Sequence, residues 1–344
     1  MGESHNSQLI LETKGLTKFF KTPRGMLHAV DHVDLRIAAN QTLGVVGESG
    51  CGKSVTAKAL LRLFDRTSGE IIPGSKIQFD SQDVMALNKK QLHAFRGAEI
   101  GMIFQDPMTS LDPTMSIGKQ VGETLMIHKG ISMKEALKQS VELLRMVEIP
   151  TPEERIKAYP HQLSGGMRQR VVIATALACN PKLLIADEPT TALDVTIQAQ
   201  VLDLLRDLKE RLGTAIILVT HDLGIVADFA DRIQVMYAGV IVEEGTKQEI
   251  FKECCHPYTW ALLRSIPQEG ASKKQLYSLK GTPPDLLLPL QGCPFASRCE
   301  YCMPICRQKA PEFTVKSPTH KAACWLQHPK APKVKRPIFT GGEQ

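Results

Sequence analysis

The stretch Gly47–Ser54 reads GESGCGKS, and its glycines and lysine are spaced as in a loop that binds phosphate. Glycine lets the backbone curl so that N–H groups face phosphate oxygens, while Lys53 adds a positive charge. Ser54 would hold Mg²⁺ through its hydroxyl. An apolar run precedes the loop, and a helical pattern, Val55–Leu63, follows it. Strand, loop and helix in this order predict a nucleotide site, because the start of a helix favours anions.

We expect the nucleotide to contact one continuous run of the chain. Its members are Gly47, Glu48, Ser49, Gly50, Cys51, Gly52, Lys53, Ser54 and Val55. Cys51 stands at a position that tolerates many side chains, so its thiol could be oxidised without being catalytic.

Two carboxylates follow a second apolar run. Residues 182–188 read KLLIADE, which is typical of a buried parallel strand that ends in Asp187 and Glu188. The carboxyl end of such a strand should place Asp187 where it can orient Mg²⁺. Glu188 is then available as the general base that polarises the attacking water.

Two further polar residues also end apolar runs. Gln105 follows Ile100–Phe104, and its amide could reach Mg²⁺ and the attacking water. His221 follows Ala215–Thr220 and could contact the γ-phosphate. Neither residue carries a strong signal alone.

The run Leu163–Met167 reads LSGGM, and Ser164 can cap a helix that begins at Gly165. Such a helix start presents free N–H groups to an anion. Together with the phosphate loop, Gln105, Asp187–Glu188, Ala192–Asp194 and His221, this run resembles the ABC-type ATPases.

The resemblance implies that the site is shared between two ATPase subunits. In that family, the Ser-Gly-Gly of one subunit caps the γ-phosphate held by the phosphate loop of the other. This implies such a role for Ser164, Gly165 and Gly166, and a nucleotide contact for Asp194. One chain has one loop and one LSGGM, so a second subunit, identical or related, is expected.

An aromatic residue that stacks on adenine usually lies before the second strand in this family. Phe19 or Phe20 would take that place, and Phe20 is preferred; the alternative is that both simply pack an edge strand.

Two features resemble the oligopeptide and dipeptide importer branch, of OppD/DppD type. These are Met167, where many family members have glutamine, and HPYT at His256–Thr259. The resemblance implies two multi-span permease subunits, an extracytoplasmic substrate-binding protein and ATP with Mg²⁺ as cofactors.

The carboxyl-terminal segment is rich in cysteine and proline. It contains Cys293, Cys299, Cys302, Cys306 and Cys324 out of nine cysteines in the chain. A cytoplasmic protein is not expected to keep structural disulfides, so metal binding is the stronger interpretation. Resemblance to the importer extension implies Cys293, Cys299, Cys306 and Cys324 as ligands of a [4Fe–4S] cluster. Zinc and free thiols stay open as alternatives, Cys302 is an extra cysteine that could substitute for a ligand, and Cys254 and Cys255 are expected to be unligated.

The length and charge of the chain limit the number of domains and the classes of partner that it can have. A chain of 344 residues has room for one ATPase domain with inserts and an extension. Its formal net charge of +6 is modest, and it has no apolar run long enough to span a bilayer. The polar start MGESHNSQ does not resemble a secretory signal. We therefore expect a peripheral protein at the cytoplasmic face of the inner membrane that binds no nucleic acid.

The pattern of runs predicts an α/β fold with a mainly parallel sheet, antiparallel edge strands and an inserted helical subdomain. In the insert, Ser132 and Glu135 form a capping box ahead of a helix that stops before Pro150. The expected domains are an ATPase core (8–104 and 168–253), the insert with LSGGM (105–167), the extension (254–328) and a basic, Pro-rich, disordered tail (329–344). By resemblance, the insert receives a helix of a permease subunit.

These features predict the ATP-hydrolysing subunit of an importer for oligopeptides or dipeptides. Related importers carry nickel or glutathione, and the sequence does not exclude such cargo. A soluble ABC ATPase acting on nucleic acid or ribosomes is the rival class. Composition argues against it, because the chain has no second ATPase unit, no coiled-coil arm and no basic stripe with aromatic residues.

Overall fold

The computed structural model describes residues 8–64, 69, 71–191, 193–266 and 279–337. Of the residues singled out above, the first seven of the polar start, Ala192 and the tail residues 338–344 lie outside this part. The chain forms two compact units. The first unit comprises residues 1–11, 36–41 and 78–218, and the second comprises residues 12–35, 42–77 and 219–344.

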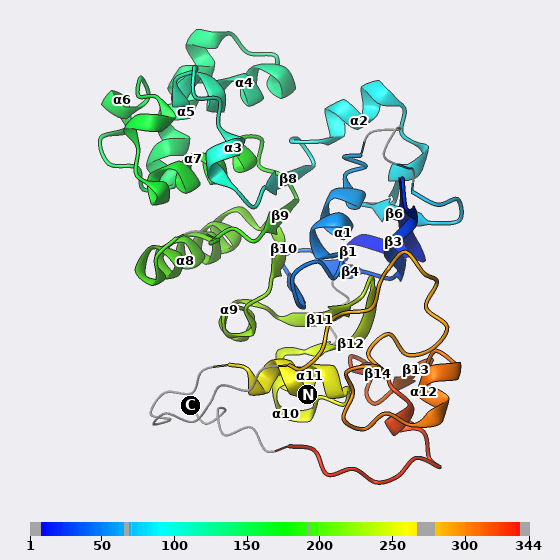
Figure 1. Ribbon diagram of the computed structural model, residues 1–344. Helices are drawn as coiled ribbons and strands as arrows, with labels where there is room; N and C mark the ends of the chain where they lie inside the picture. The colour runs from blue at the N-terminus through cyan, green and yellow to red at the C-terminus, as the bar shows by residue number, and fades with distance from the viewer. Residues whose placement is uncertain (1–7, 65–68, 70, 192, 267–278, 338–344) are drawn as a thin grey trace. The chain divides into compact units, whose positions relative to one another are not determined.

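Parallel strands form the centre of the first unit (Figure 1). Strand β8 (Ile100–Ile103) pairs in parallel with β9 (Leu183–Asp187), with Ile100 opposite Leu183. Strand β10 (Ala215–Thr220), whose last two residues belong to the second unit, neighbours β9 on its other side. Every residue of β9 and β10 is buried, which explains their unbroken apolar sequence.

Helices make up much of the rest of this unit, and α4 to α7 gather in one group (Figure 1). They are α2 (Lys89–Phe95), α3 (Pro107–Ser110), α4 (Ile117–Lys129), α5 (Met133–Met146), α6 (Pro152–Arg155), α7 (Gly165–Leu177) and α8 (Val195–Leu212), with 3-10 turns at Val84–Ala86 and Pro160–Gln162. A small sheet has the order β4 (Arg36–Ala38), β1 (Leu9–Lys14), β6 (Lys76–Phe79) and β7 (Gln82–Asp83).

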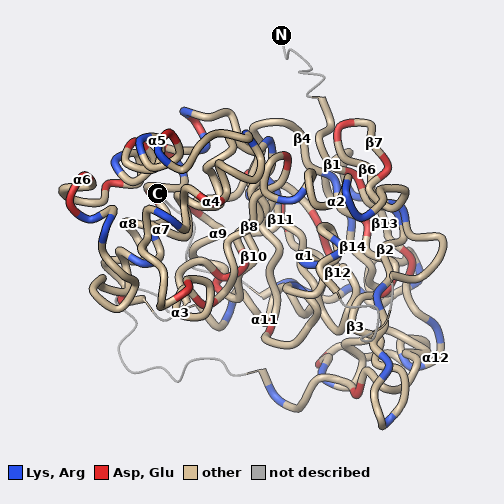
Figure 2. The backbone as a smooth tube through the Cα atoms, turned by 90° about the horizontal axis from the view of Figure 1, so that it is seen from above, with Lys and Arg blue, Asp and Glu red and all other residues tan. Residues whose placement is uncertain are grey.

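The predicted inserted helix is confirmed as α5. Ser132 caps it by accepting the N–H of Glu135 at 3.3 Å. Its most deeply buried side chains are Ala136, Ser140 and Leu144. Ala136 and Ser140 lie against Gly122 of α4, so small residues line the contact between the two helices. Figure 2 shows both charge signs along α5, whose solvated face explains them.

In the second unit, strand β5 (Thr42–Val46) pairs in parallel with β11 (Arg232–Tyr237). Antiparallel strands continue this sheet in the order β12 (Val240–Thr246), β14 (Lys321–Ala323) and β13 (Phe313–Val315). A hairpin joins β2 (Leu16–Thr22) to β3 (Gly25–Val33). The remaining elements are α1 (Lys53–Leu60), α9 (Leu223–Phe229), α10 (Lys247–Glu253), α11 (Pro257–Arg264), α12 (Pro304–Gln308) and a 3-10 turn at Trp325–Gln327.

The predicted fold class is confirmed: a mainly parallel sheet carries antiparallel edge strands and inserted helices. The domain boundaries given above stay predictions. Tail residues 329–337 form no helix or strand, but Arg336 donates a hydrogen bond to the carbonyl of Lys252 at the end of α10. No described helix has the length and apolar character that a bilayer span requires.

Candidate nucleotide site and cysteine-rich segment

The phosphate loop joins β5 to α1 in the second unit. Gly52 has φ +107°, and a Cβ there would lie 2.4 Å from the carbonyl oxygen of Ala29. A Cβ on Gly47 would lie 2.1 Å from the carbonyl oxygen of Met236. Both glycines are therefore required by close backbone approach, and Gly50 by its φ of +78°. The loop geometry that the sequence predicted is present.

The side chain of Lys53 folds back onto this loop. Its ammonium donates to the carbonyl of Gly47 at 2.8 Å and to that of Glu48 at 3.0 Å, and the residue is only 4% exposed. The ammonium therefore lies against the loop itself, where phosphate oxygens could replace the two carbonyl oxygens as its acceptors. Cys51 is buried beside it, and burial raises the pKa of its thiol, which argues against a reactive thiolate.

Glu48 is held on both its main chain and its side chain. The hydroxyl of Tyr258 in α11 accepts the N–H of Glu48 at 2.8 Å. The guanidinium of Arg298 donates to both carboxylate oxygens, with Nη2 to Oε1 at 3.0 Å. The sequence analysis named Glu48 but missed both partners. Tyr258 lies in the HPYT run and Arg298 directly precedes Cys299. Their places in these motifs were the available sign that the two residues matter, and nothing in the sequence indicated a contact with Glu48.

The carboxylates at the end of β9 are buried in the first unit. Asp187 is 1% exposed and Glu188 is 9% exposed. Gln105 donates its amide to Glu188 at 2.9 Å, and the hydroxyl of Thr191 donates to the same oxygen at 3.0 Å. Glu188 also adopts a positive φ of 48°, an uncommon conformation for glutamate. The structure therefore brings together two predicted catalytic residues and adds Thr191, which sequence reasoning missed.

The LSGGM run and Asp194 each lie at the start of a helix. Ser164 caps α7 by accepting the N–H of Met167 at 3.3 Å, as predicted. Asp194 caps α8 by accepting the N–H of Ile197 at 3.0 Å. A Cβ on Gly166 would lie 2.8 Å from Ile197, so the glycine allows the two helix starts to pack closely. Asp194 thus has a structural role whatever its contact with nucleotide.

The two remaining site residues lie in the second unit. The Phe20 ring packs edge to face on Phe64 at 5.3 Å, and the Lys18 ammonium lies 4.4 Å from its centroid. Phe19 instead packs on His28 at 3.9 Å. His221 directly follows β10 and is exposed. Phe20 is half-buried, so its predicted stacking on adenine stays a prediction.

The four cysteines expected as ligands line one cavity in the second unit. The rest of the cavity lining is mostly aromatic and apolar: His256, Pro257, Phe295, Ala296, Tyr301, Trp325 and Leu326. Burial, with a smaller contribution from neighbouring cysteines, raises the pKa of Cys293 to about 12 and that of Cys299 to about 11. Cys302 is not among the lining residues.

A second cluster involves Cys255, which the sequence analysis expected to be unligated. Among described residues, Glu243, Cys255 and His320 form the group whose potential metal-ligand atoms lie within 4.8 Å of one another. Buried Glu243 already accepts from His320 at 2.9 Å, from Thr259, from the N–H of Cys255 and from the N–H of His256 at 3.2 Å. These bonds fill the carboxylate's acceptor capacity, so we interpret the group as a structural network that joins β12 to β14.

A phosphate loop after a buried strand, two carboxylates ending another strand and a capped Ser-Gly-Gly helix start together define an ABC-type ATPase. The sequence matches the family described as ABC transporter over residues 30–191, and the oligopeptide/dipeptide transporter C-terminal region over residues 242–306.

The chain is 53% identical to the oligopeptide transport ATP-binding protein OppD of Bacillus subtilis, over 95% of this chain and 92% of the relative. It is 47% identical to OppD of Salmonella typhimurium, over 93% and 94% of the two chains. A dimeric, post-hydrolysis structure of the ATP-binding cassette MJ0796 with ADP and Pi is similar, with TM-score 0.61 and 30% identity, covering 69% of this chain and 99% of that one. The chain belongs to the ABC transporter family of oligopeptide and dipeptide transport ATP-binding proteins, and it is an ATPase.

Proposed function

We propose that this chain hydrolyses ATP to power the import of oligopeptides or dipeptides through a membrane complex. Its partners would be a second, related ATPase subunit, two multi-span permease subunits and an extracytoplasmic substrate-binding protein. The observation that carries the proposal is the match of the carboxyl-terminal extension, residues 242–306, to the peptide-transporter region. Relatives named as oligopeptide or dipeptide transport ATP-binding proteins support the same cargo.

The site residues take the following proposed roles. Lys53 and the N–H groups of the loop bind the phosphates, while Ser54, Gln105 and Asp187 hold Mg²⁺, which neutralises charge on the phosphates. Glu188 accepts the proton of the attacking water, and Gln105 with Thr191 orients its carboxylate. His221 contacts the γ-phosphate. Ser164, Gly165, Gly166 and Asp194 complete the site of the second ATPase subunit, and Phe20 stacks on adenine.

The permease contact is proposed at the loops beside α3 and α7 in the first unit. Met108 is 62% exposed, and Phe104 and Tyr159 are each about 40% exposed. Arg168 bonds both to the sulfur of Met108 and to the carbonyl of Pro160, so the two loops lie side by side. Exposed apolar side chains gathered in this way are typical of a surface that receives a partner helix.

This contact can be tested by affinity purification of the full chain from native membranes in mild detergent. We expect the wild-type chain to retain two multi-span proteins and a second ATPase. Met108→Glu places a charge on the apolar surface and should reduce permease recovery about tenfold or more. Val315→Glu, an equally exposed position on β13 in the second unit, is the matched control and should retain both permeases. Wild-type recovery of soluble factors alone would contradict the proposal.

The cysteine-rich segment is proposed to hold a [4Fe–4S] cluster through Cys293, Cys299, Cys306 and Cys324. Their shared cavity supports this. The raised thiol pKa values show that the pocket disfavours bare thiolates, so a positively charged metal centre would be needed to hold them deprotonated.

Iron content is the direct readout for this centre. We expect full chain purified without oxygen to contain iron and acid-labile sulfide and to absorb near 400 nm. Cys299→Ser should lower iron to background and lower the thermal midpoint, since the centre ties together three loop-rich stretches. Cys302→Ser changes a neighbouring cysteine outside the cavity lining and should leave both unchanged. Zinc, or no metal, in the wild-type chain would refute the cluster.

A further inference from the structure

The carboxylate of Glu48 places a negative charge within the loop that must bind the phosphates of ATP. Its side chain is 30% exposed, whereas that of its partner Arg298 is 3% exposed. Both outer nitrogens of the guanidinium meet the two carboxylate oxygens, so the pair has the bidentate geometry of a strong ion pair. The pair also links residues 250 positions apart in sequence. Such a buried fork differs from a surface salt bridge, which contributes little.

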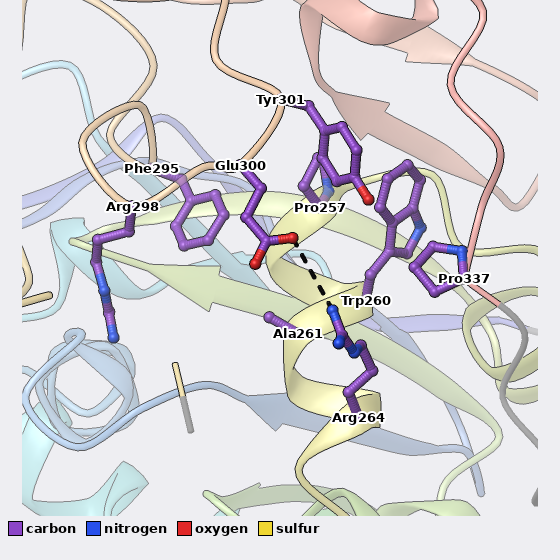
Figure 3. Close-up of a pocket in the computed structure, with 9 residues that line it drawn as sticks. All are labelled: Pro257, Trp260, Ala261, Arg264, Phe295, Arg298, Glu300, Tyr301 and Pro337. Atoms are coloured by element: carbon purple, nitrogen blue, oxygen red, sulfur yellow. Dashed lines mark ion pairs between the residues drawn. The ribbon is translucent and has the colours of Figure 1, made fainter. Parts of the chain in front are cut away.

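The other donors of Arg298 are fixed as well. Its Nε donates to the carbonyl of Lys280 at 3.0 Å, and Nη2 reaches the carbonyl of Leu279 at 3.3 Å. Nη1 lies 3.3 Å from the hydroxyl of Tyr237 at the end of β11. Figure 3 shows the guanidinium of Arg298 apart from the Arg264–Glu300 ion pair, although all three residues line one pocket. Arg298 is therefore built into the fold with one orientation, toward the phosphate loop.

The neighbour of Arg298 in sequence is Cys299, one of the cavity-lining cysteines. The N–H of Arg298 bonds to the carbonyl of Phe295 in a tight turn, and the N–H of Cys293 bonds to the carbonyl of Cys306, which joins the two ends of this segment. A displacement of the cysteines would displace Arg298 with them. Tyr258, which accepts the N–H of Glu48, packs on Phe295 of the same segment with ring centroids 5.3 Å apart.

We propose that Arg298 is a positioning residue of the phosphate loop, through which the cysteine-rich segment controls the affinity for ATP. Arg298 neutralises the carboxylate of Glu48 and fixes its direction. Without this partner, the carboxylate repels the phosphates of an incoming nucleotide, because like charges in a partly buried site disfavour each other. The inference rests on ATP binding at this loop and on the hydrogen bonds of Arg298 and Tyr258 with Glu48, and it holds whether the cysteines bind iron, zinc or nothing.

The effect on ATP can be measured with a fluorescent ATP analogue and Mg²⁺ on the purified full chain. Arg298→Met should weaken binding about 10- to 100-fold, and Arg298→Lys, which keeps the charge without the fork, by less. Glu48→Gln alone removes the carboxylate from the loop and gives the reference affinity for the double variant. The double variant Arg298→Met with Glu48→Gln should recover most of the lost affinity, because the unpaired carboxylate is gone.

Arg264→Met is the matched control. It removes an arginine of α11 that pairs with Glu300, which lies on the same segment as Arg298. This pair is looser, with 4.0 Å between Nη1 and Oε2, and both of its side chains are about half exposed. Its affinity for the analogue should equal that of wild type. Circular dichroism of every variant reports on folding. Unchanged affinity in Arg298→Met, or a double variant as weak as Arg298→Met, would overturn the proposal, since a merely structural loss would not be rescued by Glu48→Gln.

The coupling must also act in the opposite direction, because linked binding effects are reciprocal. Saturating MgATP should slow the alkylation of Cys299, followed by mass spectrometry of the metal-free chain. A Cys51→Ala background removes the thiol inside the loop itself. In the Arg298→Met variant, ATP should no longer protect Cys299. Equal alkylation with and without ATP in the parent chain would contradict the inference, while a missing iron signal would contradict only the cluster.

Discussion

Replacing Glu188 with Gln should lower ATP hydrolysis by the assembled complex at least about 100-fold, within the range expected for a general base. The amide keeps an oxygen that can accept from Gln105 and Thr191, so the local hydrogen bonds persist. It cannot take a proton from water. Affinity for MgATP should stay within about threefold of wild type, and the ATP-bound dimer of ATPase subunits should accumulate.

Steady-state phosphate release and size-exclusion chromatography in ATP check this result. Asp203→Asn is a matched control, because this exposed carboxylate of α8 forms a surface ion pair with Arg206. It should leave turnover unchanged. A Glu188→Gln complex that hydrolyses ATP near the normal rate would show that another group is the base.

Replacing Lys53 with Ala should weaken MgATP binding about 100-fold or more and abolish turnover. The buried ammonium now bonds to the carbonyls of Gly47 and Glu48, and phosphate oxygens would take over these bonds. Its loss removes the point charge of the loop and leaves two carbonyls without their donor.

Isothermal titration with MgATP measures this loss of affinity. The control is Lys58→Ala, in the last turn of the same helix α1 and away from the loop. Thermal unfolding separates a binding defect from a folding defect. Normal MgATP affinity in folded Lys53→Ala protein would contradict the assignment of Gly47–Ser54 as the phosphate loop.

Local patterns allowed the nucleotide-binding elements to be predicted. A short apolar run, closely spaced glycines and a helix start lie within about twenty residues, so β5, the loop and α1 depend on nearby sequence. The same holds for Ser164 and Ser132, whose capping bonds reach only three residues ahead.

Long-range contacts were not predictable in this way. Gln105 meets Glu188 across 83 positions, and Arg298 meets Glu48 across 250. No periodicity connects such residues, because tertiary packing alone brings them together. Asp194 illustrates another limit: the resemblance implied a nucleotide contact, whereas the structure reveals the helix cap that the side chain provides.

ATP-driven peptide uptake tests the central claim most directly. The chain would be reconstituted with its co-purified permeases, second ATPase and binding protein in liposomes, with ATP on the side of the ATPase subunits. The account predicts that a labelled short peptide crosses the membrane only with hydrolysable ATP, that excess unlabelled peptide competes while nickel or glutathione does not, and that Glu188→Gln stops transport. Normal ATP hydrolysis without peptide movement, or transport of nickel or glutathione alone, would contradict it.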